Sequence, residues 1–379
     1  MKKTYIITLF LLTLVLISCE KINDENSTKD AKELSGTVAS DMVLENRVEG
    51  AEADYYIKGK WSLEANVTIN AGVNIQMEAG SKIRVLTDGS LTALGTETNP
   101  VNIYGKQSTK GYWEELTFDN SFSGENKLNY VNISDGGGGF GFGMISVSGK
   151  SKVQISHCLI KNSSKSGVYL VNDNSELPAF HHNTIEECKD YPVHLNTSQL
   201  YYLDITTDFS GNGNKSIIEV GGSGLKEDVT WKKLSGPVLF ISGYNNIFGD
   251  LSVEAGAELV MGPGARIIVE PQGSMKMLGT SSEKITIVAD VLSPGYFEGI
   301  VYEDSNNPLN ELQFVDIAYG GSGSGANLWL SGATQIKVGN SSFNHSANYG
   351  IYVSRYAAFN DLGNNSFSGN ASDDIYVQP

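Results

Sequence analysis

The chain repeats itself, and this repeat limits its possible folds more than any other feature. Shifted by 184 positions, residues 55–137 align with residues 239–321 without a gap, and 24 of the 83 paired residues are identical. Such a repeat indicates a stacked architecture, in which each copy covers the apolar face of the next. The matched runs are rich in turn residues and include Gly89-Ser90 with Gly273-Ser274, Leu94-Gly95-Thr96 with Leu278-Gly279-Thr280, and Gly111-Tyr112 with Gly295-Tyr296.

Each half also contains a finer period of about 25 residues. Ser166-Gly167-Val168-Tyr169-Leu170 is followed 25 residues later by Tyr191-Pro192-Val193-His194-Leu195. Short alternating segments direct every second side chain to one face, and Gly, Asn or Asp separates them. A coil of three such strands cannot bury its apolar face alone but can stack on another coil. The pattern predicts an all-β solenoid of roughly a dozen coils, about 60 Å long at one strand spacing per coil.

Several glycine-led runs resemble the right-handed parallel β-helix lipoproteins of the Bacteroidetes, which share the fold of pectate lyases. The resemblance extends from about residue 34 to the C-terminus and implies one right-handed parallel β-helix with an internal duplication. It implies no particular activity, because one fold can host many functions. The runs that carry it are Ala71-Gly72-Val73-Asn74-Ile75, Gly80-Ser81-Lys82-Ile83-Arg84-Val85, Gly89-Ser90-Leu91-Thr92-Ala93-Leu94-Gly95-Thr96 and Gly111-Tyr112-Trp113-Glu114-Glu115-Leu116.

The N-terminus is typical of an exported lipoprotein. Lys2 and Lys3 precede an apolar stretch, Tyr5–Ile17, that is too short to span a bilayer comfortably. It ends in Leu16-Ile17-Ser18-Cys19, which resembles the bacterial lipobox. We therefore predict a signal peptide at residues 1–18 and lipidation of Cys19. The alternative is an ordinary cleaved signal that happens to precede a cysteine.

Three segments are predicted after the signal peptide. Residues 19–33 are polar and read as a flexible tether. Residues 34–225 and 226–379 are the two β-helix halves, expected to form one continuous solenoid. Acidic residues soon after Cys19 resemble the surface-export signal of Bacteroidetes lipoproteins. These features predict a protein that is lipid-anchored to the outer membrane and exposed at the cell surface.

Charge and cysteine content narrow the possible partners. The formal charge is −16, and removal of the two N-terminal lysines makes it about −18. A chain this acidic repels phosphate backbones, so nucleic acid is not an expected partner. The expected partners are the membrane, through the lipid, and a polysaccharide or an envelope protein. Cys158 and Cys188 could pair in an oxidising compartment, although two core thiols are the more ordinary explanation.

Catalytic motifs of related folds are missing from the sequence. Polygalacturonase-like sites need several Asp residues, and lyase-like sites need an Arg or Lys base beside carboxylates that hold Ca²⁺. Asp373-Asp374 stands without its companion motifs, and Asn183-Thr184 is followed by Ile185 instead of Asp. We therefore assign no catalytic residue. Whether the protein is an enzyme stays uncertain, with a non-catalytic role preferred.

Two further features of the sequence have residues that could bind a metal ion. His157 and His182 lie 25 residues apart, so they should stack one strand spacing apart, as a metal site, an acid–base pair or an ordinary outward polar ladder. The second half has Asn340 and Asn364 at the equivalent places. Two loops rich in Asp and Asn, residues 119–126 and 303–310, could hold Ca²⁺, although solvated turns are the ordinary explanation. No metal ligand and no other cofactor is assigned.

Repeated aromatic residues are the best indication of a ligand. Tyr112-Trp113 and Tyr296-Phe297 occupy equivalent positions, and Tyr201-Tyr202 and Trp231 lie near the junction of the halves. Exposed rings can stack on sugars, so Tyr112, Trp113, Tyr296 and Phe297 are predicted ligand-contacting residues. Alternation should direct one ring of each pair inward.

The combined features predict a non-catalytic envelope β-helix that binds carbohydrate or another extracellular macromolecule. One alternative is a divergent polysaccharide lyase or glycoside hydrolase. A basic residue beside a carboxylate cluster in a groove would favour that alternative. Another alternative is an assembly partner of envelope proteins, which predicts an exposed apolar patch.

Overall fold

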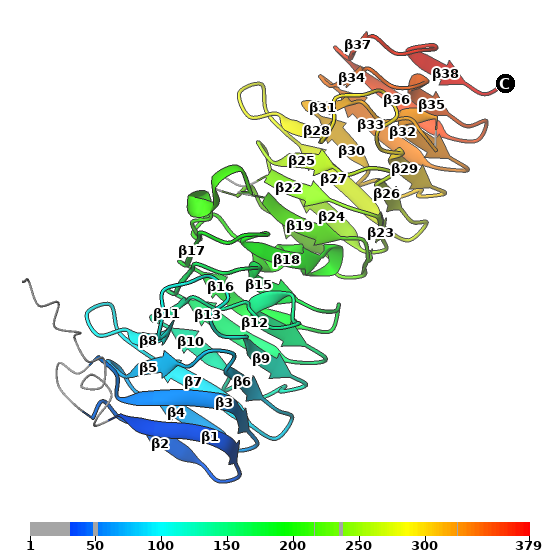
Figure 1. Cartoon of the computed structure of the whole chain (residues 1–379). Coiled ribbons are helices and arrows are strands. Elements are labelled where there is room, and N and C mark those ends of the chain that lie inside the picture. Colours follow the sequence, from blue (N-terminus) through cyan, green and yellow to red (C-terminus); the bar gives the residue numbers. More distant parts are fainter. Residues whose placement is uncertain (1–30, 48–51, 216, 235–237, 324) are drawn as a thin grey trace, which may run out of the picture.

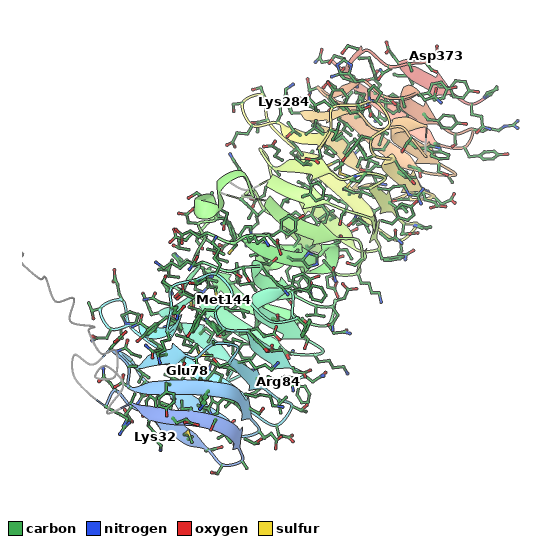
Figure 2. All side chains as sticks on the ribbon, viewed as in Figure 1. Lys32, Glu78, Arg84, Met144, Lys284 and Asp373 are labelled. Atoms are coloured by element: carbon green, nitrogen blue, oxygen red, sulfur yellow. The ribbon has the colours of Figure 1, made fainter. Side chains whose placement is uncertain are left out.

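The computed structural model describes residues 31–47, 52–215, 217–234, 238–323 and 325–379. They form a parallel β-solenoid of about 13 right-handed turns with almost no helix. The solenoid is an elongated rod with β1 (Lys32–Val38) at one end and β38 (Ile375–Val377) at the other (Figure 1). Lys32 and Asp373 mark these ends in Figure 2. The predicted fold class and number of coils are confirmed.

The predicted lipoprotein segment falls mostly outside this description. The signal peptide at 1–18 and the lipidation site Cys19 lie outside the described residues. Strand β1 begins at Lys32, so the described rod starts two residues before the predicted start of the first β-helix half at residue 34. Within the described part of the chain, no helix is long and apolar enough to cross a bilayer.

The first half is a three-sided coil whose strands stack in three parallel columns. Strand β3 (Tyr55–Leu63) spans the first two columns, pairing with β5 and with β6. Column one contains β5 (Asn74–Met77), β8 (Val101–Gly105), β11 (Val131–Ser134), β14 (Leu159–Lys161) and β17 (Thr184–Glu186). Column two contains β6 (Lys82–Val85), β9 (Leu116–Asp119), β12 (Gly143–Ser148), β15 (Ser166–Leu170) and β18 (Val193–Asn196). Column three contains β2 (Met42–Leu44), β4 (Asn66–Ile69), β7 (Ser90–Leu94), β10 (Lys127–Asn129), β13 (Lys152–Ser156) and β16 (Glu176–His181).

The second half is again three-sided, and column two runs on into it because β18 pairs with β19. The continuation of column two is β19 (Ile217–Gly221), β22 (Val238–Ile241), β25 (Glu258–Met261), β28 (Ile285–Ala289), β31 (Val315–Ala318), β34 (Ser342–Asn344) and β37 (Ser366–Ser368). A second sheet contains β20 (Gly224–Leu225), β23 (Tyr244–Ile247), β26 (Arg266–Val269), β29 (Gly299–Glu303), β32 (Ala326–Ser331), β35 (Tyr349–Val353) and β38. A third contains β21 (Val229–Trp231), β24 (Asp250–Val253), β27 (Ser274–Leu278), β30 (Glu311–Gln313), β33 (Gln335–Gly339) and β36 (Ala358–Gly363).

The two halves are offset by one column of stacked strands. The sequence repeat relates β5 in column one to β25, which lies in column two. It relates β6 in column two to β26, which lies in a different sheet. Column one ends at β17, where η3 (Ser210–Lys215) packs against it and Asp208 bridges to Thr184. Equivalent strands of the duplication therefore lie in different columns.

Inward-facing side chains form continuous aliphatic stacks, as alternation predicts. In column one the strand registers place five isoleucines directly above one another, all fully buried: Ile75, Ile103, Ile133, Ile160 and Ile185. Each buried aliphatic side chain of this size contributes about 1.5–3 kcal/mol. The core is continuous from Leu34 to Val353, so the halves share one interior.

Corner residues between strands adopt left-handed backbone conformations, which Asn and His tolerate better than most residues. His157 and His182 both have φ of 54°, and their rings stack with centroids 4.9 Å apart, as predicted. Asn340 and Asn364 occupy the same corners of the second half, with φ of 53° and 59°. Burial lowers the pKa of His157, and the neighbouring histidines lower it further. Stacked corner residues are therefore common to both halves, but their chemistry differs.

The remaining cysteines and the two oxygen-rich loops have structural roles. Cys158 and Cys188 are free and buried, and burial raises the pKa of each thiol to about 12. In the first loop the amide of Asn126 donates to the carbonyl oxygen of Ser121 at 3.0 Å, and Asn310 donates to Ser305 in the same way. Both asparagines are buried, so their side chains hold turns together.

Candidate functional site

Two of the four predicted ligand-contacting rings belong to the core. Trp113 and Phe297 are fully buried, which corrects their assignment as ligand contacts. The indole N–H of Trp113 donates to the carbonyl oxygen of Ser134 at 2.6 Å. Glycine makes room for each ring, because a Cβ at Gly136 or Gly320 would lie 2.8 Å from it. Trp231, noted near the junction, is fully buried as well.

Tyr112 and Tyr296 are the members of these pairs that reach the surface, and both are partly exposed. Each follows a glycine with positive φ, Gly111 or Gly295, and starts the turn that leads into β9 or β29. The strands that follow the two tyrosines, β9 and β29, lie in different columns and in different halves of the rod. The role of each tyrosine in ligand binding stays a prediction, and the two tyrosines are to be tested separately.

The structure forms a larger candidate site at the junction of the halves. A groove of about 540 Å³ opens there. Strands β13 and β16, the loops after β9 and β15, and η2 (Thr197–Tyr202) build it. We call it the junction groove; its lining residues are Phe122, Lys150, Lys152, Asp173, Asn174, Glu176, Ser198, Gln199, Tyr201, Tyr202 and Glu227.

Local hydrogen bonds fix the 3₁₀ segment that forms one wall of the groove. Asn196 caps η2, and its backbone N–H donates to Gln199 Oε1 at 3.0 Å. Gln199 Nε2 donates to the carbonyl oxygens of Asn172 and Ser175, which ties η2 to the turn before β16. Leu200 is buried beneath the wall. The tyrosines that follow it are therefore held in place at the groove.

Aromatic rings supply the apolar part of the groove. Tyr201 and Tyr202 lie with ring centroids 4.4 Å apart, and Phe122 is 54% exposed across from them in the lining. Burial raises the pKa of Tyr202, and a hydrogen bond with Tyr201 raises it further. The Tyr202 hydroxyl therefore stays protonated and can donate a hydrogen bond.

Charged groups of both signs supply the polar part. Lys152 Nζ lies 2.9 Å from Glu176 Oε2, and both side chains of this ion pair are exposed to solvent. Asp173 accepts hydrogen bonds from Asn196 at 2.7 Å and Ser198 at 3.1 Å. With Glu227 and Lys150 the groove holds three carboxylates and two ammonium groups. It therefore offers many hydrogen-bonding groups and no excess of positive charge.

A second hollow, of about 410 Å³, lies on column one. Its floor is a ladder of asparagines in which Asn132 donates to Asn102, and Asn102 to Asn74, each at 2.8 Å. These amides satisfy one another, and Tyr104 donates to the carbonyl oxygen of Glu52. Its polar groups are thus largely engaged within the protein, which makes the junction groove the better candidate.

Sequence reasoning found only part of this site. It singled out Tyr201 and Tyr202 near the junction but gave no role to Phe122, Lys152 or Glu176. These residues are separated by dozens of positions and meet only through the stacking of coils. The 25-residue period alone would not have paired Lys152 with Glu176, because a register shift separates this pair from Gln154 and Ala179.

Comparisons with known protein families, with curated proteins and with solved structures found no match to this chain. The site is therefore judged on its own geometry and chemistry.

Proposed function

We propose that this protein is a lipid-anchored envelope protein whose β-helix binds carbohydrate in the junction groove. The observation that carries the proposal is the combination of paired tyrosines with a polar, solvent-open lining. A sugar ring has an apolar face that stacks on aromatic rings and an edge of hydroxyl groups that need hydrogen-bonding partners. Tyr201 and Tyr202 suit the face, and Asp173 and Glu176 suit the edge.

The charge of the groove favours neutral sugars. Three carboxylates against two ammonium groups repel a polyanion, and the negative charge of the whole chain adds to that repulsion. Neutral oligosaccharides avoid this cost. The expected ligand is therefore a neutral glycan that occupies several subsites along the groove.

Binding to glycans tests the proposal directly. The chain from Glu20 onward, which retains every described residue, should bind neutral oligosaccharides on an array or in calorimetry. Tyr201→Ala should weaken binding at least about fivefold, since an aromatic contact is worth about 0.5–1.5 kcal/mol beyond its buried area. Tyr356→Ala removes a tyrosine that is 75% exposed and lies outside the groove, so it should leave binding unchanged. Glycan binding that is unchanged by Tyr201→Ala would mean that the ligand binds outside the groove. The absence of any glycan binding would refute the proposal.

The membrane anchor is a separate part of the proposal. The lipobox-like Leu16-Ile17-Ser18-Cys19 supports acylation of Cys19, and the acidic residues after it support display at the cell surface. Growth with a labelled fatty acid should label the wild-type chain and leave Cys19→Ala unlabelled. Protease treatment of intact cells should then degrade the anchored protein. Label on Cys19→Ala would contradict the anchor, and full protection from protease would contradict surface display.

A second candidate function is a divergent polysaccharide lyase. Lys152 beside Glu176, Asp173 and Glu227 in a groove is the feature that favours an enzyme of this class. An ion-paired ammonium group has no lone pair for proton abstraction, however, and β-elimination needs an acidic sugar that this groove repels. Release of unsaturated products from an acidic polysaccharide, abolished by Lys152→Ala, would establish the lyase instead.

A further inference from the structure

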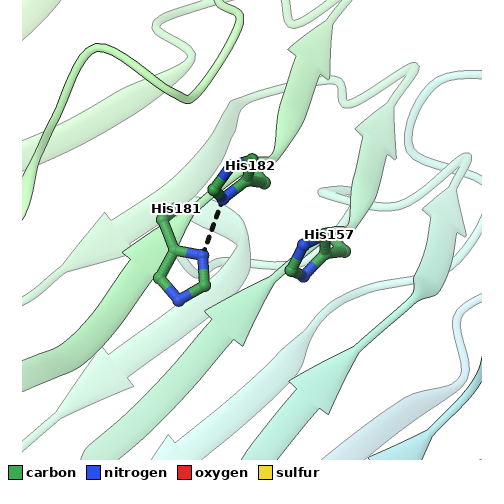
Figure 3. A group of neighbouring side chains, drawn as sticks. All are labelled: His157, His181 and His182. Atoms are coloured by element: carbon green, nitrogen blue, oxygen red, sulfur yellow. Dashed lines mark hydrogen bonds between the residues drawn. The ribbon is translucent and has the colours of Figure 1, made fainter.

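Three histidines meet at one corner of the first half, away from the junction groove. His157 and His182 are consecutive members of the corner stack, and His181 is the last residue of β16. The His181 ring stands at right angles to both others, with centroids 5.6 Å from His157 and 5.2 Å from His182 (Figure 3). One ring nitrogen from each residue lies within 4.8 Å of the other two.

The backbone holds these rings in place. The backbone N–H of His157 donates to the carbonyl oxygen of His181 at 3.2 Å, and that of His182 donates to Thr206 Oγ1 at 2.9 Å. Tyr130 stacks on the outer side of His157, with centroids 4.6 Å apart. The arrangement is therefore built by strand pairing and by the corner stack, and does not depend on mobile loops.

The polar atoms of the cluster are only partly satisfied. His181 Nδ1 and His182 Nδ1 share one hydrogen bond of 3.0 Å. The buried Nδ1 of His157 has no hydrogen-bond partner among the residues that the structure describes. A buried polar atom without a partner is rare in folded proteins and calls for an explanation, such as an unobserved ion.

The second half serves as a natural control. Asn340 and Asn364 stand at the corners of His157 and His182, and Asn364 Nδ2 donates to Asn340 Oδ1 at 3.1 Å. Gly363 occupies the place of His181, since both pair with the preceding coil at the same register. An asparagine ladder therefore satisfies this corner without any ligand. The histidine ladder leaves a nitrogen unsatisfied and adds a third imidazole.

We propose that His157, His181 and His182 form a binding site for a divalent transition metal, with Zn²⁺ as the expected ion. Imidazole nitrogen suits Zn²⁺, Ni²⁺ and Cu²⁺, whereas Ca²⁺ and Mg²⁺ require oxygen ligands. Four-coordinate zinc with bonds of 2.0–2.1 Å holds its ligand nitrogens about 3.3 Å apart. Zinc binding therefore draws the three nitrogens together and turns the stacked rings of His157 and His182 out of their parallel arrangement, so that their lone pairs converge on the ion. Three protein ligands leave a fourth position for water or for a ligand from outside, on the side where His182 is exposed.

Zinc titration of the metal-free chain from Glu20 onward, carrying no affinity tag, tests this site. One equivalent should bind, and Co²⁺ in its place should give the visible absorption of a four-coordinate nitrogen site. The double variant His157→Asn with His182→Asn copies the second half and should fold normally. It should bind Zn²⁺ at least tenfold more weakly, since two of three ligands are lost.

His345→Asn is the matched control, because His345 stacks on Tyr319 in the second half and lies outside the cluster. This variant should keep both the stoichiometry and the affinity. Zinc binding that survives in the double variant would overturn the proposal. So would the absence of a one-equivalent transition in the wild-type chain. Neither result would bear on glycan binding in the junction groove.

Discussion

The two halves of the rod share a sequence repeat and an interior, yet they differ at corners that face solvent. Inward positions match closely: Trp113 and Phe297 fill the same space in their coils, and each rests against a glycine. At the corners the histidines of the first half stand where the second half has asparagines. The comparison teaches that the repeat constrains packing and leaves outward-facing corners free to acquire separate chemistry.

The largest effect is expected when the shared packing is broken. Trp113→Ala and Phe297→Ala should each destabilise the protein by about 3–5 kcal/mol, because each leaves a cavity in a close-packed core. Trp113→Ala should cost more, since it also removes the indole hydrogen bond to Ser134. Urea unfolding followed by circular dichroism measures both free energies of unfolding. Equal costs, or a greater cost at Phe297, would show that the hydrogen bond adds nothing.

A smaller effect is expected at the repeated glycines. A Cβ at Gly89 would lie 2.2 Å from the carbonyl oxygen of Leu63, and Gly273 has the same clash with Ile247. Gly89→Ala and Gly273→Ala should therefore each cost about 1–3 kcal/mol or slightly more, as overpacking does. Thermal unfolding should show similar losses at the two sites. A clear difference between them would mean that the two interiors are not equivalent.

Gly80 provides the control for that pair. It has φ of 66° and open space around the position of a Cβ, so Gly80→Ala adds left-handed strain without a clash. The expected cost is about 1–2 kcal/mol. If Gly80→Ala lowered the free energy of unfolding as much as Gly89→Ala, the glycines would be needed for their backbone conformation and not for the close approach of neighbouring atoms.

The fold was predictable from the sequence because alternation and a 25-residue period act locally and repeat many times. The offset between the halves was not, because the number of residues between β18 and β25 decides which face receives the next strand. The sequence did not show which ring of each pair would reach a ligand for a related reason: alternation directs one ring of the pair inward but does not say which. The space beside Gly136 accommodates the Trp113 ring, so Trp113 is the member of the pair that points inward. The junction groove depends on both the offset and the stacking, so only its tyrosines could be found.

The offset by one column also limits what the duplication can do in recognition. Two linked copies of a binding site normally raise avidity, because the second contact forms within an already joined complex. That gain requires a partner that can engage both copies at once. Here equivalent positions such as Tyr112 and Tyr296 precede strands of different columns, β9 and β29. A polymer lying along the rod can therefore engage both only if its path shifts from one column to the other, which favours partners that can bend.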